Sequence, residues 1–208
     1  MQEPYKHLLI RIYSNTLLKI KNTLEVLTKD LHLKEDYVRE LCDSMKKQGL
    51  ILESEGEFKL TSLGRSKIKV VFTGGVFDII HPGHVFALSS AKNLGDVLVV
   101  VIARDKTVIK NKGHSPFNNE EKRLELVKSL KFVDVALLGV EGAIFESIMK
   151  VKPDIIALGY DQKHDESELE KEAKKRGLSI KFVRLGTEMP DIKSSKIIEN
   201  RKEITNEF

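Results

Sequence analysis

The segment at 73–84, TGGVFDIIHPGH, constrains the fold of this chain more than any other feature of the sequence. The run before it, at 69–72, is β-branched and aromatic, which is typical of a buried strand. Apolar residues after it recur at helical spacing until Gly95 ends the pattern. The sequence therefore predicts a strand, a tight loop and a helix, in that order.

Two histidines of this segment are expected on one face of the predicted helix. Pro82 suits the first helical position, where its missing N–H costs nothing, so His81 lies near the cap and His84 within the first turn. Helix N-termini bind anions, and Gly83 leaves the approach open. The pattern predicts a phosphate site. The alternative is a chance string of surface or core histidines.

The letters GGVFDIIHPGH resemble the G-x-F-D-x-x-H-x-G-H signature of the cytidylyltransferase-like nucleotidyltransferases. These enzymes transfer a nucleoside monophosphate from ATP or CTP to a phosphorylated acceptor. Class I aminoacyl-tRNA synthetases carry a related H-I-G-H, but 208 residues leave no room for a tRNA-recognition body. The resemblance implies that His81 and His84 are catalytic. It implies nucleotide binding by Thr73, Gly74, Gly75, Val76, Phe77, Asp78, His81, Gly83 and His84, although the glycines could also be plain turn residues.

Composition places the chain among ordinary soluble globular proteins, with 41% hydrophobic and 32% charged residues. No apolar run approaches the roughly 18 residues of a membrane span. Charges interrupt the start, so we expect no signal peptide and a cytoplasmic location. The single cysteine, Cys42, excludes an internal disulfide and lies on an apolar helical face, where a buried, inert thiol is expected.

Residues 1–66 are expected to form a separate module. Apolar periodicity indicates helices at 5–13 and 23–31 and a third helix that ends at Gly49, followed by a hairpin with strands at 50–53 and 58–60. Three helices and a two-stranded wing resemble a winged-helix domain. Such domains most often bind DNA, but this module carries 11 basic and 10 acidic residues, a net charge of only +1. DNA binding and a packing or homodimerisation role both stay open.

Residues 67–208 alternate strands and helices, which predicts a nucleotidyltransferase domain built on a doubly wound, five-stranded parallel sheet of Rossmann-like α/β class. Ligands of such sheets bind at the carboxyl ends of the strands. The expected strands are at 69–72, 96–103, 133–138, 154–158 and 180–185. The expected helices are at 81–94, 120–130, 143–152, 166–176 and 194–204.

Basic residues after the second strand are interpreted as a charged loop that neutralises a triphosphate. Lys112 and Arg123 are the catalytic candidates among them, and a solvated charged loop is the alternative. The resemblance implies lysines in this loop and a basic residue near Lys131. The full set is Arg104, Lys106, Lys110, Lys112, His114, Lys122 and Arg123.

Two further segments are expected at the nucleotide. The fourth strand ends in Gly159, Tyr160 and Asp161, where the family carries a G-Y-D-Q type sequence. Ser194 and Ser195 open the predicted closing helix and resemble the family's I-S-[ST]-[ST] segment, with Lys193 in place of a hydroxyl residue. Hydroxyls there can cap a helix and also reach phosphate.

Within the family, GYDQKHDE and the stretch from Ala136 resemble the archaeal FAD synthases, which adenylylate FMN. The resemblance implies ATP and FMN as substrates and Mg²⁺ held mainly by nucleotide phosphates. Two alternatives stay open: a CTP:glycerol-3-phosphate cytidylyltransferase, and a flavin- or nucleotide-sensing regulator that binds DNA.

Overall fold

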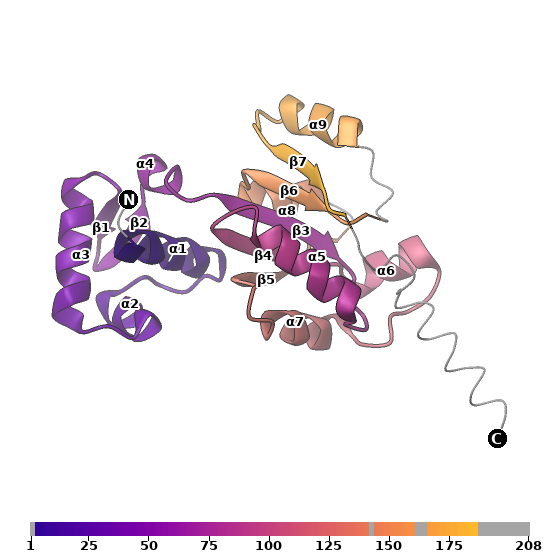
Figure 1. The fold of residues 1–208 in the computed structure, drawn as a ribbon, viewed down its shortest axis with the longest axis horizontal. Coiled ribbons are helices and arrows are strands. Elements are labelled where there is room, and N and C mark those ends of the chain that lie inside the picture. The colour runs from indigo at the N-terminus through magenta and orange to yellow at the C-terminus, as the bar shows by residue number, and fades with distance from the viewer. Residues whose placement is uncertain (1–2, 142–143, 161–165, 187–208) are drawn as a thin grey trace, which may run out of the picture. The chain divides into compact units, whose positions relative to one another are not determined.

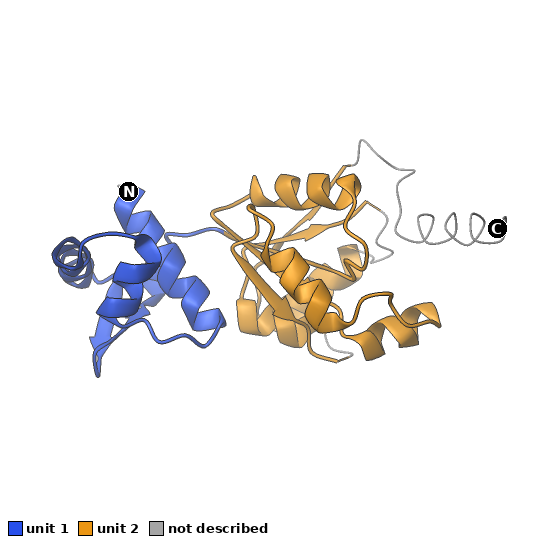
Figure 2. Cartoon of the chain, turned by 90° about the horizontal axis from the view of Figure 1, so that it is seen from below, with its two compact units in different colours: residues 1–69 blue, residues 70–208 orange. Residues whose placement is uncertain are grey.

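The computed structural model describes residues 3–141, 144–160 and 166–186. Contacts within the chain divide it into two compact units, Met1–Lys69 and Val70–Phe208, which Figure 2 colours separately. Each unit has its own buried core, and we describe each by itself. Within the described ranges, no helix is both long enough and apolar enough to cross a membrane.

The first unit packs three helices against a two-stranded antiparallel hairpin. Leu8, Leu9 and Ile12 of the first helix are completely buried, as are Leu27 and Met45 of the next two. A short fourth helix follows the hairpin. The elements are α1 (Glu3–Leu17), α2 (Leu24–Leu31), α3 (Glu35–Lys47), β1 (Ile51–Ser54), β2 (Glu57–Leu60) and α4 (Ser62–Arg65).

The buried polar side chains of the first unit are uncharged. Asn22 accepts the N–H of Phe58 on its carbonyl and donates from Nδ2 to the Ile12 carbonyl, so it joins the hairpin to α1. Cys42 is buried on α3, and burial raises the pKa of its thiol to about 11. A thiol with that pKa carries almost no nucleophilic thiolate at neutral pH.

The second unit is an α/β domain on a five-stranded, fully parallel sheet, which confirms the predicted fold class (Figure 1). The strand order is β5-β4-β3-β6-β7. The chain adds β4 and β5 on one side of β3 and then β6 and β7 on the other, so the switch point of the sheet lies between β3 and β6. Every residue of β4 and of β6 is buried. The strands are β3 (Val70–Gly75), β4 (Val97–Ile102), β5 (Val135–Leu138), β6 (Ile155–Leu158) and β7 (Lys181–Arg184).

Helices cover both faces of this sheet. Helix α5 packs on β3 and β4, and α7 packs on β4 and β5. Because parallel crossovers are right-handed, the change of side places α8 on the other face, and Figure 1 shows α8 behind the sheet and α5 in front. The helices are α5 (Pro82–Lys92), α6 (Asp105–Lys112), α7 (Glu120–Lys128), α8 (Ile144–Val151) and α9 (Glu166–Lys175).

The basic segment after β4 is not the loop that the sequence predicts, because Asp105–Lys112 forms helix α6. Its apolar signal is weak, since Val108 is the only buried residue among its eight. Gly113 ends the helix at φ 76° and donates its N–H to the Ile109 carbonyl. The predicted helix at 194–204 lies outside the described residues.

Candidate active site at the switch point

The loop after β3 lies at the switch point of the sheet, and its backbone is tightly folded. Phe77 has a φ of 53°, a left-handed conformation that non-glycine residues rarely adopt. Its buried ring lies so close to Gly75 that a Cβ there would approach the ring to 2.8 Å. Gly75 is therefore required by the packing of Phe77 and is more than a turn glycine.

Helix α5 begins directly after this loop. His81 is the N-cap residue, and its carbonyl accepts the N–H groups of His84 at 2.9 Å and Val85 at 3.2 Å. Pro82 occupies the first helical position, as expected. The helix thus directs its positive end toward the carboxyl edge of the sheet.

The two motif histidines are stacked on each other. Their ring centroids lie 3.9 Å apart with an interplanar angle of 28°, and the Phe77 ring packs against His84 at 5.3 Å. The Nδ1 atom of each imidazole is buried, so a ligand has to approach both rings from another side. The sequence prediction that His81 and His84 share one face is met by this arrangement.

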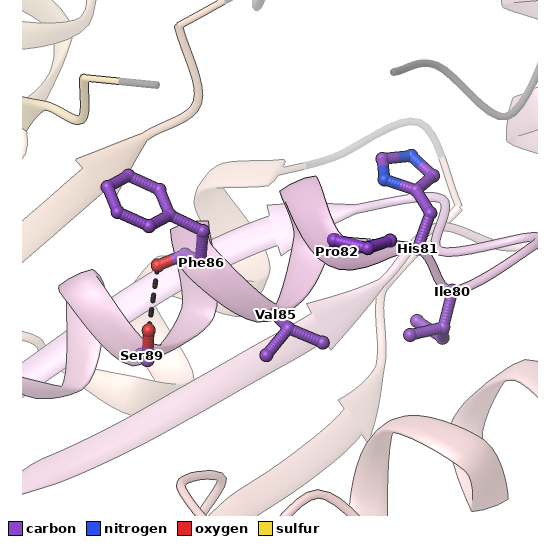
Figure 3. A pocket seen from close by; sticks show the side chains of 6 residues that line it. All are labelled: Ile80, His81, Pro82, Val85, Phe86 and Ser89. Atoms are coloured by element: carbon purple, nitrogen blue, oxygen red, sulfur yellow. Dashed lines mark hydrogen bonds between the residues drawn. The ribbon is translucent and has the colours of Figure 1, made fainter. Parts of the chain in front are cut away.

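An open depression of about 560 Å³ adjoins His81 along α5. Most of its lining is apolar, and Figure 3 shows His81 and Phe86 on one side of the helix with Val85 and Ile80 on the other. Ser89 donates its hydroxyl to the Phe86 carbonyl at 2.9 Å.

Asp78 holds the segment before α7 against the motif loop. The carboxylate of Asp78 is buried and accepts the N–H groups of Phe117 and Asn118, each at 2.8 Å. The side-chain amide of Asn118 returns a bond to the Asp78 carbonyl, also at 2.8 Å. Two hydrogen bonds to the charged form stabilise this carboxylate, and its oxygens are used within the protein.

Arg123 has a fully buried side chain whose donors bind the protein itself. Its guanidinium donates to the Val76 carbonyl at 2.6 Å and to the Ala103 carbonyl at 2.8 Å. It also donates to the Asn118 carbonyl at 3.0 Å and to the Asp105 carboxylate at 2.7 Å. This placement differs from the catalytic contact expected from the sequence. Arg123 joins the ends of β3 and β4 to the start of α7.

The starts of α6 and α7 cap each other. The Asp105 N–H donates to the Glu120 carboxylate at 2.7 Å, and the Glu120 N–H donates to Asp105 at 3.3 Å. Arg104 pairs with Glu120 at 3.0 Å. Sequence reasoning missed Asp105, Glu120 and Asn118. An acidic residue opening each helix was the available signal, but it required α6 to be recognised first.

The remaining basic candidates lie on the surface. Lys112 is the exposed last residue of α6, and Lys106 pairs with Glu141 at 3.2 Å. Both of these ammonium groups can move to meet a polyphosphate. The exposed side chains are Lys106, Lys110, Lys112, His114, Lys122 and Lys131.

The end of β6 faces the same edge. The Thr73 hydroxyl is buried and donates to the Ala157 carbonyl at 2.9 Å, so it joins β3 to β6. Arg184 donates to the Gly159 carbonyl at 3.1 Å and to Glu166 at 2.7 Å. Gly159 and Tyr160 are half-buried. The other expected nucleotide contacts, Asp161, Ser194 and Ser195, lie outside the described residues.

The fold defines a parallel α/β protein in which a helix N-terminus follows the strand at the switch point, and nucleotide-binding proteins of this class bind phosphates at that place. The cytidylyltransferase-like family model matches residues 72–200, and the chain belongs to this family.

Relatives and a solved structure agree with this assignment. The FAD synthase of Aciduliprofundum boonei is 55% identical over 115 residues, which are 55% of this chain and 76% of that protein. The FAD synthase of Thermoplasma volcanium is 47% identical over 134 residues, 64% of this chain and 93% of that protein. The crystal structure of the lipopolysaccharide core biosynthesis protein from Thermoplasma volcanium is 49% identical and covers 58% of this chain and 98% of its own, with a TM-score of 0.56.

Proposed function

We propose that this chain is an FMN adenylyltransferase, which converts ATP and FMN to FAD and pyrophosphate. The observation that carries the proposal is the stacked pair His81 and His84 at the N-terminus of α5. This pair lies in a chain that is 47% and 55% identical, over 64% and 55% of its length, to two proteins named FAD synthase. The helix end and the two imidazoles supply donors for phosphate oxygens, and the apolar depression beside His81 suits an attached ring system.

The proposed reaction is an in-line displacement. An oxygen of the FMN phosphate attacks the α-phosphorus of ATP and forms a new P–O bond. The bond between the α-phosphorus and the oxygen that bridges it to the β-phosphorus breaks, and pyrophosphate leaves with that electron pair. A phosphate monoester is largely dianionic at pH 7, so the attack needs no strong base. Catalysis then consists of positioning the reactants and stabilising the developing charge.

We assign the charge-stabilising role to His81 and His84 and a phosphate-neutralising role to Lys112. The histidines act as hydrogen-bond donors rather than as bases. Gly159 and Tyr160 at the end of β6 are proposed to line the nucleotide. Arg123 and Asp78 act as positioning residues, since each is buried in contacts with the protein backbone.

Mg²⁺ is the metal that a nucleotide reaction of this kind commonly uses. Among the residues that the structure describes, no cluster of three His, Cys, Asp or Glu side chains is suited to hold a metal ion. Mg²⁺ usually binds through one or two carboxylates and substrate phosphates, so we propose that it is held mainly by the nucleotide phosphates. No step of the reaction above is assigned to it.

Purified protein incubated with ATP or CTP, each against FMN or glycerol 3-phosphate, tests the proposal. We expect FAD and pyrophosphate only from the pair ATP and FMN, detected by chromatography of the flavin. Turnover of CTP with glycerol 3-phosphate and none of FMN would overturn the choice of substrates and would still support nucleotidyl transfer as the reaction. No turnover of any pair would overturn the enzymatic proposal.

A further inference from the structure

The segment between α6 and α7 presents one aromatic side chain to solvent beside the motif loop. Phe117 is 68% exposed, the highest value among large apolar side chains in the described part of the chain, and the next, Leu63, is 49% exposed. Single exposed apolar residues are common on protein surfaces. The position of Phe117 is unusual because the backbone on both sides of it is held by buried charged groups.

Two such groups fix this backbone. The buried carboxylate of Asp78 accepts the N–H of Phe117 and the N–H of Asn118, both at 2.8 Å. The fully buried guanidinium of Arg123 donates to the Asn118 carbonyl at 3.0 Å. These bonds fix the backbone that carries the ring to Asp78, which lies three residues before His81 in the sequence. A fixed backbone lowers the conformational freedom that this segment loses when a ligand covers the ring.

The hydrogen bonds also indicate on which side of the motif the ring lies. Arg123 bonds the Ala103 carbonyl after β4 as well as the Asn118 carbonyl, so this segment belongs to the β4 side of β3. The proposed nucleotide contacts, Gly159 and Tyr160, follow β6 on the opposite side of β3. A planar ligand that meets Phe117 is therefore the acceptor rather than the base of the triphosphate.

We propose that Phe117 is a specificity-determining residue that stacks on the isoalloxazine ring of FMN while the FMN phosphate lies toward His81 and His84. This inference rests on the proposed function, because it takes FMN as the acceptor. Stacking on an aromatic side chain favours a flat conjugated acceptor over a small aliphatic phosphate, which has no ring to cover Phe117.

The test is a titration of FMN fluorescence with the full chain and variants at Phe117. Phe117→Ala is expected to weaken FMN binding about tenfold, with ATP binding unchanged. Phe117→Tyr should keep the FMN affinity of the parent and, because a phenol is oxidised far more easily than a phenyl ring, should quench flavin fluorescence on stacking where the parent does not. Phe117→Leu keeps apolar volume without a ring and should not restore the affinity lost in Phe117→Ala. Leu126→Ala, which shortens another exposed apolar side chain of the same unit, is the matched control and should change neither FMN nor ATP affinity.

Each result decides between the alternatives. FMN binding unchanged in Phe117→Ala would overturn the inference, as would a loss of ATP binding with FMN binding intact. Full restoration of the affinity by Phe117→Leu, or no quenching of bound FMN by Phe117→Tyr, would also overturn stacking. A melting temperature lowered equally in the Ala and Leu variants, without a change in FMN affinity, would assign the ring to folding. FMN binding that depends on Phe117 in a protein that forms no FAD would refute the proposed function and leave the FMN site standing. FAD formation independent of Phe117 would refute the site and leave the proposed function standing.

Discussion

The two units use charge in opposite ways. In the first, charged side chains pair on the surface over short distances along the sequence, as Arg39 does with Glu35 at 2.9 Å, both more than half exposed. In the second, Asp78 and Arg123 are buried and bind backbone groups of segments 20 to 47 residues away. Burying a charge is costly unless every contact is made, so the second unit concentrates that cost where three segments meet.

The buried charges of the second unit gather at the motif loop. The buried groups connect the end of β3, the end of β4 and the start of α7, which are the segments that carry the phosphate-binding candidates. The first unit has no comparable network among its described residues: its buried polar side chains, Ser14, Asn15 and Asn22, are uncharged. Charged groups in its interior are absent, and its surface pairs contribute little to stability.

Removing the Arg123 guanidinium gives the largest expected effect. Arg123→Met leaves three carbonyls and the Asp105 carboxylate without their donor, so the free energy of unfolding of the second unit should fall by about 3–5 kcal/mol. Urea denaturation monitored by circular dichroism measures this loss. Arg123→Lys should be intermediate, because one ammonium cannot reach all four acceptors.

The matched control is Arg39→Met in the first unit, expected to cost only about 0.3–0.5 kcal/mol. Comparable losses for Arg123→Met and Arg39→Met would remove the contrast between the two units. Arg123→Met with full stability and lost turnover would return Arg123 to the catalytic role expected from the sequence.

The burial of Arg123 shows where sequence reasoning reached its limit. Its position at a predicted helix start after a basic segment indicated a phosphate contact, and nothing in the local pattern distinguishes an exposed arginine from a buried one. Burial depends on which carbonyls the fold brings within reach, and Val76 is 47 residues away. The role of Asp105 was missed for a similar reason. Asp105 can be recognised as a residue that opens a helix only if α6 is predicted, and the single buried apolar residue of α6 gives almost no periodic signal.

The succession of strands and helices along the chain and the start of the motif helix, by contrast, followed from the sequence. The run at 97–102 is apolar at every position, and all six residues are buried in β4, as a central parallel strand requires. Pro82 and the glycine loop fixed where α5 begins. These features are local and need no knowledge of distant partners, which is why they were predictable. The stacking of His81 on His84 at 3.9 Å is closer than spacing alone implied.

The next largest effect concerns chemistry rather than folding. His81→Ala and His84→Ala each remove a proposed donor to oxygens whose charge grows during transfer, so kcat should fall about 10²- to 10³-fold, with KM for ATP changing far less. His114→Ala is the control, because His114 is exposed and its Nδ1 contacts the carbonyl of the neighbouring Ser115. Steady-state kinetics of FAD formation measure all three.

Both motif variants should unfold at nearly the same temperature as the parent protein, which separates them from Arg123→Met. Full turnover by well-folded His81→Ala and His84→Ala proteins would contradict the assignment of this helix end as the phosphate site. A kcat loss in His114→Ala as large as theirs would move the reactive phosphate toward the segment that follows α6.

The smallest effect is expected for DNA binding by the first unit, which we propose to be a winged-helix module with a packing role. The polar face of α3 pairs its own charges: Arg39 bonds Glu35, and Lys46 bonds Asp43 at 2.9 Å and Glu53 at 2.6 Å. Cations already neutralised by neighbouring carboxylates gain little from phosphate contact. We therefore expect no sequence-selective binding at about 150 mM salt, and only weak association at low salt that disappears as salt rises.

Fluorescence anisotropy with the full chain and labelled duplexes measures this association. The double variant Glu35→Gln, Asp43→Asn releases part of the pairing on Arg39 and Lys46, and it should bind any duplex more tightly than the parent at low salt, with a steeper salt dependence. Nanomolar, sequence-selective binding by the parent protein at about 150 mM salt would refute the expectation and would identify the first unit as a sequence-specific DNA-binding domain. A double variant that binds no better than the parent would show instead that the α3 face is unsuited to DNA for a reason other than its paired charges.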